Sequence, residues 1–199
     1  MRAAERCAGQ KKLSSMLLAL KIVTITLAAI SMALALAHAL EWPGKMRLSK
    51  EDYLAVQPIY YPGFTIGGIA EPLSILLALV LTVLMPTGST AFVLMIGACL
   101  ALIAMHLTYW LMTHPVNNFW LKDLKLKKAG SLFFSFGRSS GAADWTALRD
   151  QWERSHILRT VFGLTGFILI VAAQLLDAQS SMTDMKKARP RGLAFSSGI

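Results

Sequence analysis

Residues Ala91–Met112 read AFVLMIGACLALIAMHLTYWLM, and the polar segment HPVNNFW follows at 114–120. The apolar part is long enough to cross a lipid bilayer, which requires about 20 apolar residues in a helix. It carries one histidine, His106, in its last third. Three other apolar runs have the same layout: each is a long apolar segment with polar residues near one end. The stretch therefore predicts a membrane helix with a polar site near one membrane face.

The composition extends this prediction to the whole chain. The 199 residues are 55% hydrophobic and only 16% charged, and the apolar residues form uninterrupted blocks. We expect an all-α, integral membrane four-helix bundle with up-down-up-down topology and an amphipathic helix leading into the fourth span. The expected spans cover about residues 16–38, 64–85, 90–113 and 157–177. They form a membrane domain over 16–178, between a basic flank at 1–15 and a basic tail at 179–199.

The formal charge of +9 would suit a nucleic-acid partner, but its distribution favours lipid. No nucleic-acid-binding module is recognisable. The basic residues instead gather beside apolar runs, where anionic head groups lie: Arg2, Arg6, Lys11, Lys12, Lys186, Lys187, Arg189 and Arg191. Cys7 and Cys99 are poorly placed to pair, so neither a disulfide framework nor a CxxC motif is expected. The expected partner is therefore the lipid bilayer and not nucleic acid.

The first apolar run carries a polar stripe. Thr24, Ser31 and His38 recur at intervals of seven, and Glu41 follows three residues later on the same helical face. Because hydroxyls and an imidazole are costly against lipid, this face should point into the bundle. Residues 37–39 resemble a signal-peptide cleavage site, but the apolar run exceeds the usual signal length of about 7–15 residues. We expect the segment to be retained as a helix.

The second span contains a carboxylate. Glu71 lies about two turns inside it, a position that marks a functional site by default, and Pro72 follows directly. Because proline cannot donate to the carbonyl of Gly68, a kink and a free acceptor are expected beside Glu71. The preceding connection, residues 42–63, is rich in Trp, Tyr and Pro. Its aromatic residues are expected either at head-group level or as a lid over the site.

Polar residues also mark the end of the third run. His106, Trp110 and Asn117 share one side at helical spacing, with His114 slightly off it. Pro115 is expected to end or kink this helix at His114. A lone histidine in such a helix is more often a satisfied interior residue than a ligand, but His106 is expected at about the depth of Glu71.

The fourth run is preceded by a loop at 120–143, after which Asp144 resembles an N-cap. The helix that follows is expected to continue unbroken into the fourth span. One of its faces carries large, basic and small residues at intervals of three and four: Trp145, Arg149, Trp152, His156, Arg159 and Gly163. Two cations and a histidine on a bundle-facing stripe indicate more than packing.

Helix direction alone brings these polar ends to one membrane face, because the spans alternate in direction. All four histidines of the chain are expected there, together with two carboxylates. Three chemistries fit the cluster. In the first, glutamate and histidine act as general base and proton relay. In the second, histidines with a carboxylate bind a transition metal. In the third, Arg159 and Glu71 form a structural ion pair.

Two segments resemble the anthrone-oxygenase-like family of small four-helix membrane proteins, most of which have no assigned function. They are His114-Pro115-Val116-Asn117-Asn118 and residues 145–160, WTALRDQWERSHILRT, and the resemblance covers roughly residues 16–178. Characterised members are cofactor-independent oxygenases that convert anthrones to anthraquinones. The resemblance implies that five positions bind and deprotonate an activated phenolic substrate so that its carbanion meets oxygen: His114, Asn117, Trp152, His156 and Arg159.

The leading functional prediction is a membrane oxidoreductase, acting without a cofactor on a lipophilic aromatic or quinone-like molecule. Glu71 or His106 is the expected base, and His156 the expected proton relay. Arg159 is expected to stabilise anionic oxygen. Further contacts to the substrate are expected from Trp110, His114, Asn117, Trp152 and His38. The alternative is a non-enzymatic small membrane subunit or binding protein whose polar cluster is structural. For a plasma or bacterial inner membrane, we expect the termini in the cytoplasm.

Overall fold

The computed structural model describes residues 2–120 and 145–188, and within these residues it contains helices and no strand. Four apolar helical stretches are long enough to cross a membrane by length and composition. The first lies in α1 (Arg2–Lys45) and the last in α8 (Trp145–Ala188). The second combines α3 (Gly63–Gly67) with α4 (Ala70–Leu84), and the third is α5 (Thr90–Thr108) with its continuation.

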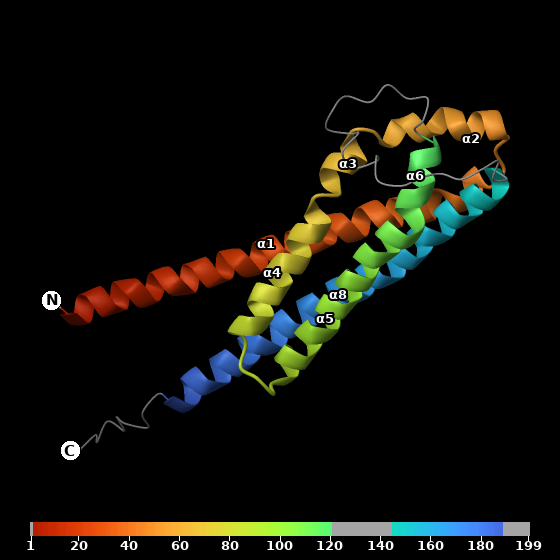
Figure 1. Cartoon of the computed structure of the whole chain (residues 1–199). Helices are drawn as coiled ribbons and strands as arrows, with labels where there is room; N and C mark the ends of the chain where they lie inside the picture. The colour runs from red at the N-terminus through yellow and green to blue at the C-terminus, as the bar shows by residue number, and fades with distance from the viewer. Residues whose placement is uncertain (1, 121–144, 189–199) are drawn as a thin grey trace, which may run out of the picture.

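The four long helices form a ring in which each contacts the next, in the order α1, α4, α5, α8 and back to α1. Their directions alternate, which confirms the expected all-α, up-down-up-down bundle (Figure 1). The start of α1 and the end of α8 lie at one end, here named the terminal end. The opposite end, named the site end, holds four short helices: α2 (Lys50–Val56), the 3₁₀ helix η1 (Gln57–Tyr60), α3 and α6 (His114–Trp120) (Figure 1).

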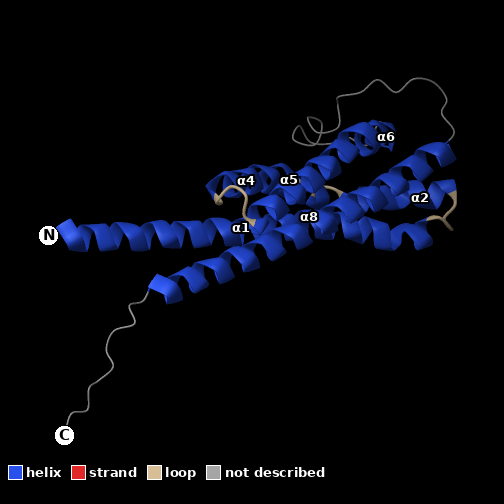
Figure 2. Cartoon of the chain, turned by 90° about the horizontal axis from the view of Figure 1, so that it is seen from below, coloured by secondary structure: helices blue, strands red, loops and turns tan. Residues whose placement is uncertain are grey.

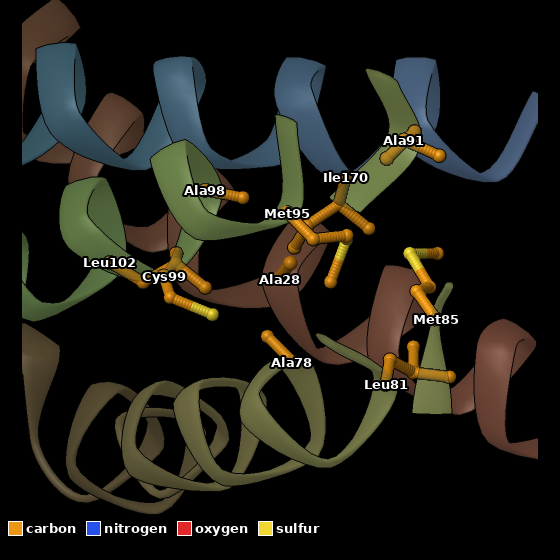
Figure 3. Packing of buried hydrophobic residues seen from close by; sticks show 11 residues of the cluster. Ala28, Ala78, Leu81, Met85, Ala91, Met95, Ala98, Cys99, Leu102 and Ile170 are labelled. Atoms are coloured by element: carbon orange, nitrogen blue, oxygen red, sulfur yellow. The ribbon is translucent and has the colours of Figure 1, made fainter. Parts of the chain in front are cut away.

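Small residues and methionine fill the centre of the bundle. Figure 3 shows Ala28, Ala78 and Ala98 around Met95 and Ile170, all of them fully buried. Small side chains let neighbouring helices approach closely, as is typical of helices packed in membranes. One close approach is at Gly163 of α8, where an added Cβ would lie 3.3 Å from the backbone of Met32 in α1.

The outer surface is apolar along most of the bundle. Exposed side chains include Leu76 and Val83 on α4, Leu100 on α5, and Leu164 and Ile168 on α8. A surface of this extent suits contact with acyl chains. An inward-facing polar stripe was predicted on the first run, and burial confirms it for Thr24, Ser31 and His38 of α1. The prediction is wrong for Glu41, whose side chain is 42% exposed because it lies beyond the packed part of the bundle.

Two helix breaks shape the site end. Between α3 and α4, the carbonyl of Gly68 cannot accept from Pro72, because proline has no N–H. It accepts instead from the N–H of Glu71 at 3.1 Å. In the third span, a π-helical turn η2 (Tyr109–Thr113) separates α5 from α6, so the break precedes His114 and the helix then continues past Pro115. The kink beside Glu71 was expected. The expected free acceptor is not found, because the carbonyl of Gly68 is paired with Glu71. The continuation of a helix to Trp120 was not expected.

The outer helices are longer than the expected spans. Both α1 and α8 contain 44 residues, which at 1.5 Å per residue make about 66 Å, far more than a bilayer's apolar core of about 30 Å. They extend past the α4–α5 turn at the terminal end (Figure 2). α8 is unbroken, as expected, and includes residues 179–188 of the expected tail. The expected loop at 121–143, the N-cap Asp144 and residues 189–199 lie outside the described residues.

Candidate functional site

A cavity of about 340 Å³ lies at the site end, between the four long helices and the connection that follows α1. Every helix of the ring contributes to its lining, and η1 and α3 close part of it. Eight of the nine sequence-predicted site residues line this cavity: His38, Glu71, His106, Trp110, Asn117, Trp152, His156 and Arg159. The expected convergence at one end of the bundle is therefore confirmed for these residues.

Glu71 is the centre of the polar wall. One of its carboxylate oxygens lies 2.9 Å from Nδ1 of His106, and the other accepts a hydrogen bond from Nη2 of Arg159 at 2.6 Å. The carboxylate is almost fully buried, with 5% of its side chain exposed. Three helices thus meet at one carboxylate, which both partners stabilise in its charged form.

The hydrogen bonds of His106 determine its tautomer. The indole N–H of Trp110 donates to Nε2 of His106 at 2.9 Å, so this nitrogen must carry a lone pair. The proton of the neutral ring is then on Nδ1, from which it is donated to Glu71. Glu71 therefore orients His106, and the basic lone pair on Nε2 faces Trp110.

Arg159 connects this wall to a pair of packed histidines, His156 and His38. Its Nη1 lies 3.4 Å from Nδ1 of His156, and its guanidinium lies 5.2 Å from the ring centre of Tyr109. Because arginine only donates, Nδ1 of His156 is the acceptor and the proton of this neutral ring is on Nε2. The ring of His156 packs against His38 with centroids 4.1 Å apart.

Aromatic rings make the opposite wall. His38 packs against Tyr60 at 4.4 Å, Phe64 at 4.6 Å and Trp152 at 5.0 Å between ring centroids. The indole N–H of Trp152 donates to Oδ1 of Asn117 at 2.8 Å, which leaves the amide NH₂ of Asn117 as a donor. A flat, mostly apolar molecule with one acidic or carbonyl group matches a cavity whose polar groups are gathered on one side.

A second polar cluster lies behind this aromatic wall. Lys45 is buried, 2.7 Å from Glu41 and 3.9 Å from the fully buried Glu153, and its ammonium packs on the rings of Tyr60 and Trp152. Tyr53 of α2 donates to Glu153 at 2.9 Å, and Tyr60 donates to Glu41. These bonds hold the connection after α1 against α8.

The phenols of this cluster stay protonated. Burial, followed by the nearby Glu153 carboxyl, raises the pKa of Tyr53 far above its ordinary value. Burial and the bond to Glu41 raise the pKa of Tyr60 in the same way. Both hydroxyls therefore remain donors to carboxylates throughout the physiological pH range.

His114 is the one predicted site residue that does not line the cavity. It is buried behind Trp110, with ring centroids 4.8 Å apart, and also packs near Tyr109 at 5.8 Å. Its place suits support of the Trp110 ring rather than contact with a bound molecule. Of the expected head-group aromatics, Tyr60 and Tyr61 line the cavity, whereas Trp42 does not.

Sequence reasoning missed Glu153, Lys45 and Tyr53. Glu153 is four residues after Arg149 and three before His156, so helical spacing places it near the predicted stripe. Lys45 is four residues after Glu41, a common ion-pair spacing. Neither signal indicated burial, because burial depends on the docking of α2.

The geometry favours acid–base chemistry at His106 over a metal centre. Among residues 2–120 and 145–188, no three His, Cys, Asp or Glu side chains are grouped so that they could hold a metal ion. The Glu71–His106 pair has the form of an oriented general base, and Arg159 and Asn117 supply donors nearby. Comparison of this chain with family models, with curated proteins and with solved structures finds no match.

Proposed function

We propose that the protein is a membrane oxidoreductase that oxygenates a lipophilic aromatic or quinone-like molecule, with His106 as the general base. The observation that carries the proposal is the Glu71–His106 pair in a buried, largely aromatic cavity. A carboxylate on Nδ1 fixes the orientation and tautomer of the ring, which is how oriented histidine bases are built. The proposal also draws on the two segments that resemble the anthrone-oxygenase-like family, at 114–118 and 145–160.

The proposed reaction begins when a bound anthrone-type ring replaces the Trp110 N–H at Nε2 of His106. His106 removes a proton from the ring CH₂, and the electron pair moves onto the carbonyl oxygen as an enolate. Arg159 and the amide of Asn117 are the donors closest to this role, and preorganised donors of this kind supply much of an enzyme's rate gain. His156, held by Arg159, is the proposed relay.

The carbanion form of the enolate then reacts with dioxygen, and the new C–O bond gives a hydroperoxide after reprotonation from His106. Loss of the second ring hydrogen with cleavage of the O–O bond gives the quinone carbonyl and water. The balance is one CH₂ group and one O₂ converted to one C=O and one H₂O, so no external reductant is consumed.

Oxygen uptake by the purified, membrane-reconstituted protein tests the proposal, with 1,8-dihydroxyanthrone as the probe. The wild type should exceed the spontaneous rate, and His106→Gln should lower the enzymatic part by about 10²–10⁴-fold, the usual contribution of a general base. Glutamine keeps a donor for Glu71 and lacks a basic nitrogen. A wild-type rate equal to the spontaneous rate would contradict the enzyme and favour the non-enzymatic subunit or binding protein.

The matched control is Asp177→Asn, which removes an ion pair of 2.6 Å, Lys21–Asp177, toward the terminal end of the bundle. It should keep oxygen uptake while it lowers thermal stability. Equal losses of uptake in Asp177→Asn and His106→Gln would assign the effect of both to folding rather than to chemistry.

We further propose that the termini face the cytoplasm of a plasma or bacterial inner membrane. In the sequence, basic residues precede the first span at Arg6, Lys11 and Lys12 and follow the third span at 122–128. The first helix usually dominates orientation, which favours cytoplasmic termini. A topology reporter fused after Ile199 should be active only in its cytoplasmic form.

A further inference from the structure

The cavity is covered tightly toward the aqueous side. There the connection after α1 packs down through Tyr53, which is fully buried, and Gln57, which is 8% exposed. The Tyr53–Glu153 and Tyr60–Glu41 hydrogen bonds fasten it to α8 and α1. Tyr53 also packs with Val116 and Trp152 in an apolar cluster. A molecule arriving from water on this side would meet the fully buried Tyr53–Glu153 bond.

Within residues 2–120 and 145–188, the seam between α4 and α5 is covered far less. His106 and Trp110 both line the cavity, yet 32% of the His106 side chain and 42% of Trp110 are exposed. Trp110 lies between Leu107 and Leu111, which are 52% and 72% exposed on the apolar outer surface. Across the seam, the cavity residue Pro72 is exposed between Leu73 and Ile69. Cavity wall and outer apolar surface are therefore continuous here.

The depth of this seam suits an amphiphilic molecule. Trp110 is 20 residues beyond Thr90, where α5 begins, which is about 30 Å along a helix and equals the thickness of the apolar core. Trp110 is thus at the level of one head-group boundary, a place where tryptophan is common, and His106 is one turn deeper. A molecule with an apolar body and one polar group would reach the seam from that boundary.

We infer that the cavity is loaded sideways from the lipid phase, through a portal bounded by Pro72, His106 and Trp110, with the Trp110 indole as its gate. The gate is held by a hydrogen bond from Trp110 to Nε2 of His106 and by packing of the indole on the rings of His114 and Tyr109. Opening it breaks that bond and uncovers the lone pair of the base in the same movement. The ligand's identity rests on the proposed function, but the route follows from the uneven cover of the cavity.

Cysteine labelling in phosphatidylcholine vesicles tests the route without any turnover. In full-length protein with Cys7→Ser and Cys99→Ala, a reporter thiol is placed inside the cavity by Ser31→Cys, since Ser31 is 2% exposed and lines it. Two reagents are compared, bilayer-dissolved N-(1-pyrenyl)maleimide and a water-soluble sulfonated maleimide. The lipophilic reagent should label faster, and Trp110→Ala should raise its rate by about fivefold, the effect of losing one hydrogen bond.

Two controls accompany the reporter. Leu100→Cys, on the outer apolar surface, should react at a rate that Trp110→Ala leaves unchanged. Tyr53→Phe, which loosens the connection after α1, should leave lipophilic labelling of Ser31→Cys unchanged. Faster labelling by the sulfonated reagent, or a rise with Tyr53→Phe and none with Trp110→Ala, would overturn the lateral route. Because labelling needs no reaction with oxygen, its failure is separate from failure of the proposed oxygenase.

Discussion

His106 has hydrogen-bond partners on both ring nitrogens, and those partners decide where its proton resides. Glu71 accepts from Nδ1, and Trp110 donates to Nε2. The second cavity histidine is arranged in the opposite way, because Arg159 occupies Nδ1 of His156 as a donor. His106 and His156 therefore hold opposite tautomers, and the lone pair of His106 faces Trp110 at the portal.

This assignment predicts the nitrogen resonances of the two rings. In protein labelled with ¹⁵N-histidine near neutral pH, His106 should show the Nδ1–H pattern and His156 the Nε2–H pattern. The signals are assigned by their loss in His106→Gln and His156→Gln. In Trp110→Phe, the Nε2 resonance of His106 should move toward that of a lone pair without a donor. An Nε2–H pattern for His106 would contradict its role as a base toward the cavity.

Residue spacing predicted much of this site. The approach of Glu71 to His106 followed from helix direction and depth alone, since each lies about the same distance from the site end of its helix. The tautomers could not be predicted, because they depend on contacts of about 3 Å that spacing does not fix. Glu153 escaped prediction for another reason: its burial comes from Tyr53, 100 residues away in the chain.

At the scale of elements, two interruptions bring the site together. The π turn at Tyr109–Thr113 closes with the N–H of His114 donating to the carbonyl of Tyr109. The carbonyl of Met112, near this turn, accepts from Gln151 of α8 at 3.0 Å. Such turns are frequent at functional sites, and this one carries Trp110. Pro72 and Pro115 indicated that both helices would be interrupted. They did not indicate a π turn, whose Met112 carbonyl is paired with a side chain of α8.

The crossing of α1 and α8 gives the prediction for this scale. At Gly163, one turn from Arg159, an added Cβ would meet Met105 Sδ at 3.0 Å and the Met32 backbone at 3.3 Å. Gly163→Ala should therefore lower the free energy of unfolding by about 1–3 kcal/mol, the usual cost of overpacking. Gly44→Ala, which meets nothing within 4 Å, should raise it by about 0.4–1 kcal/mol. Unfolding titrations of both variants in the same detergent measure the two changes. A higher free energy of unfolding in Gly163→Ala would contradict the prediction, because it would mean that α1 and α8 can move apart at no cost.

The whole molecule is held in register by ion pairs at both ends. Arg159–Glu71 joins α8 to α4 at the site end, and Lys21–Asp177 joins α1 to α8 toward the terminal end, each at 2.6 Å. The sequence predicted four antiparallel spans because apolar length and loop length are local properties. It did not predict the full lengths of α1 and α8, since their outer turns are polar and carry no span signal.

The two ion pairs should act independently on stability. Their α8 residues are 18 positions apart, about 27 Å along the helix, and effects at such separations are usually additive within about 0.5 kcal/mol. Glu71→Gln leaves the buried Arg159 uncompensated and should cost about 3–5 kcal/mol. Asp177→Asn, at a more exposed pair, should cost about 1.5–3 kcal/mol. Unfolding of both single variants and the double variant measures the sum. If the loss in the double variant differs from the sum of the single losses by well over about 0.5 kcal/mol, the cavity and the terminal end are energetically coupled. The terminal pair could then no longer serve as a control for the site.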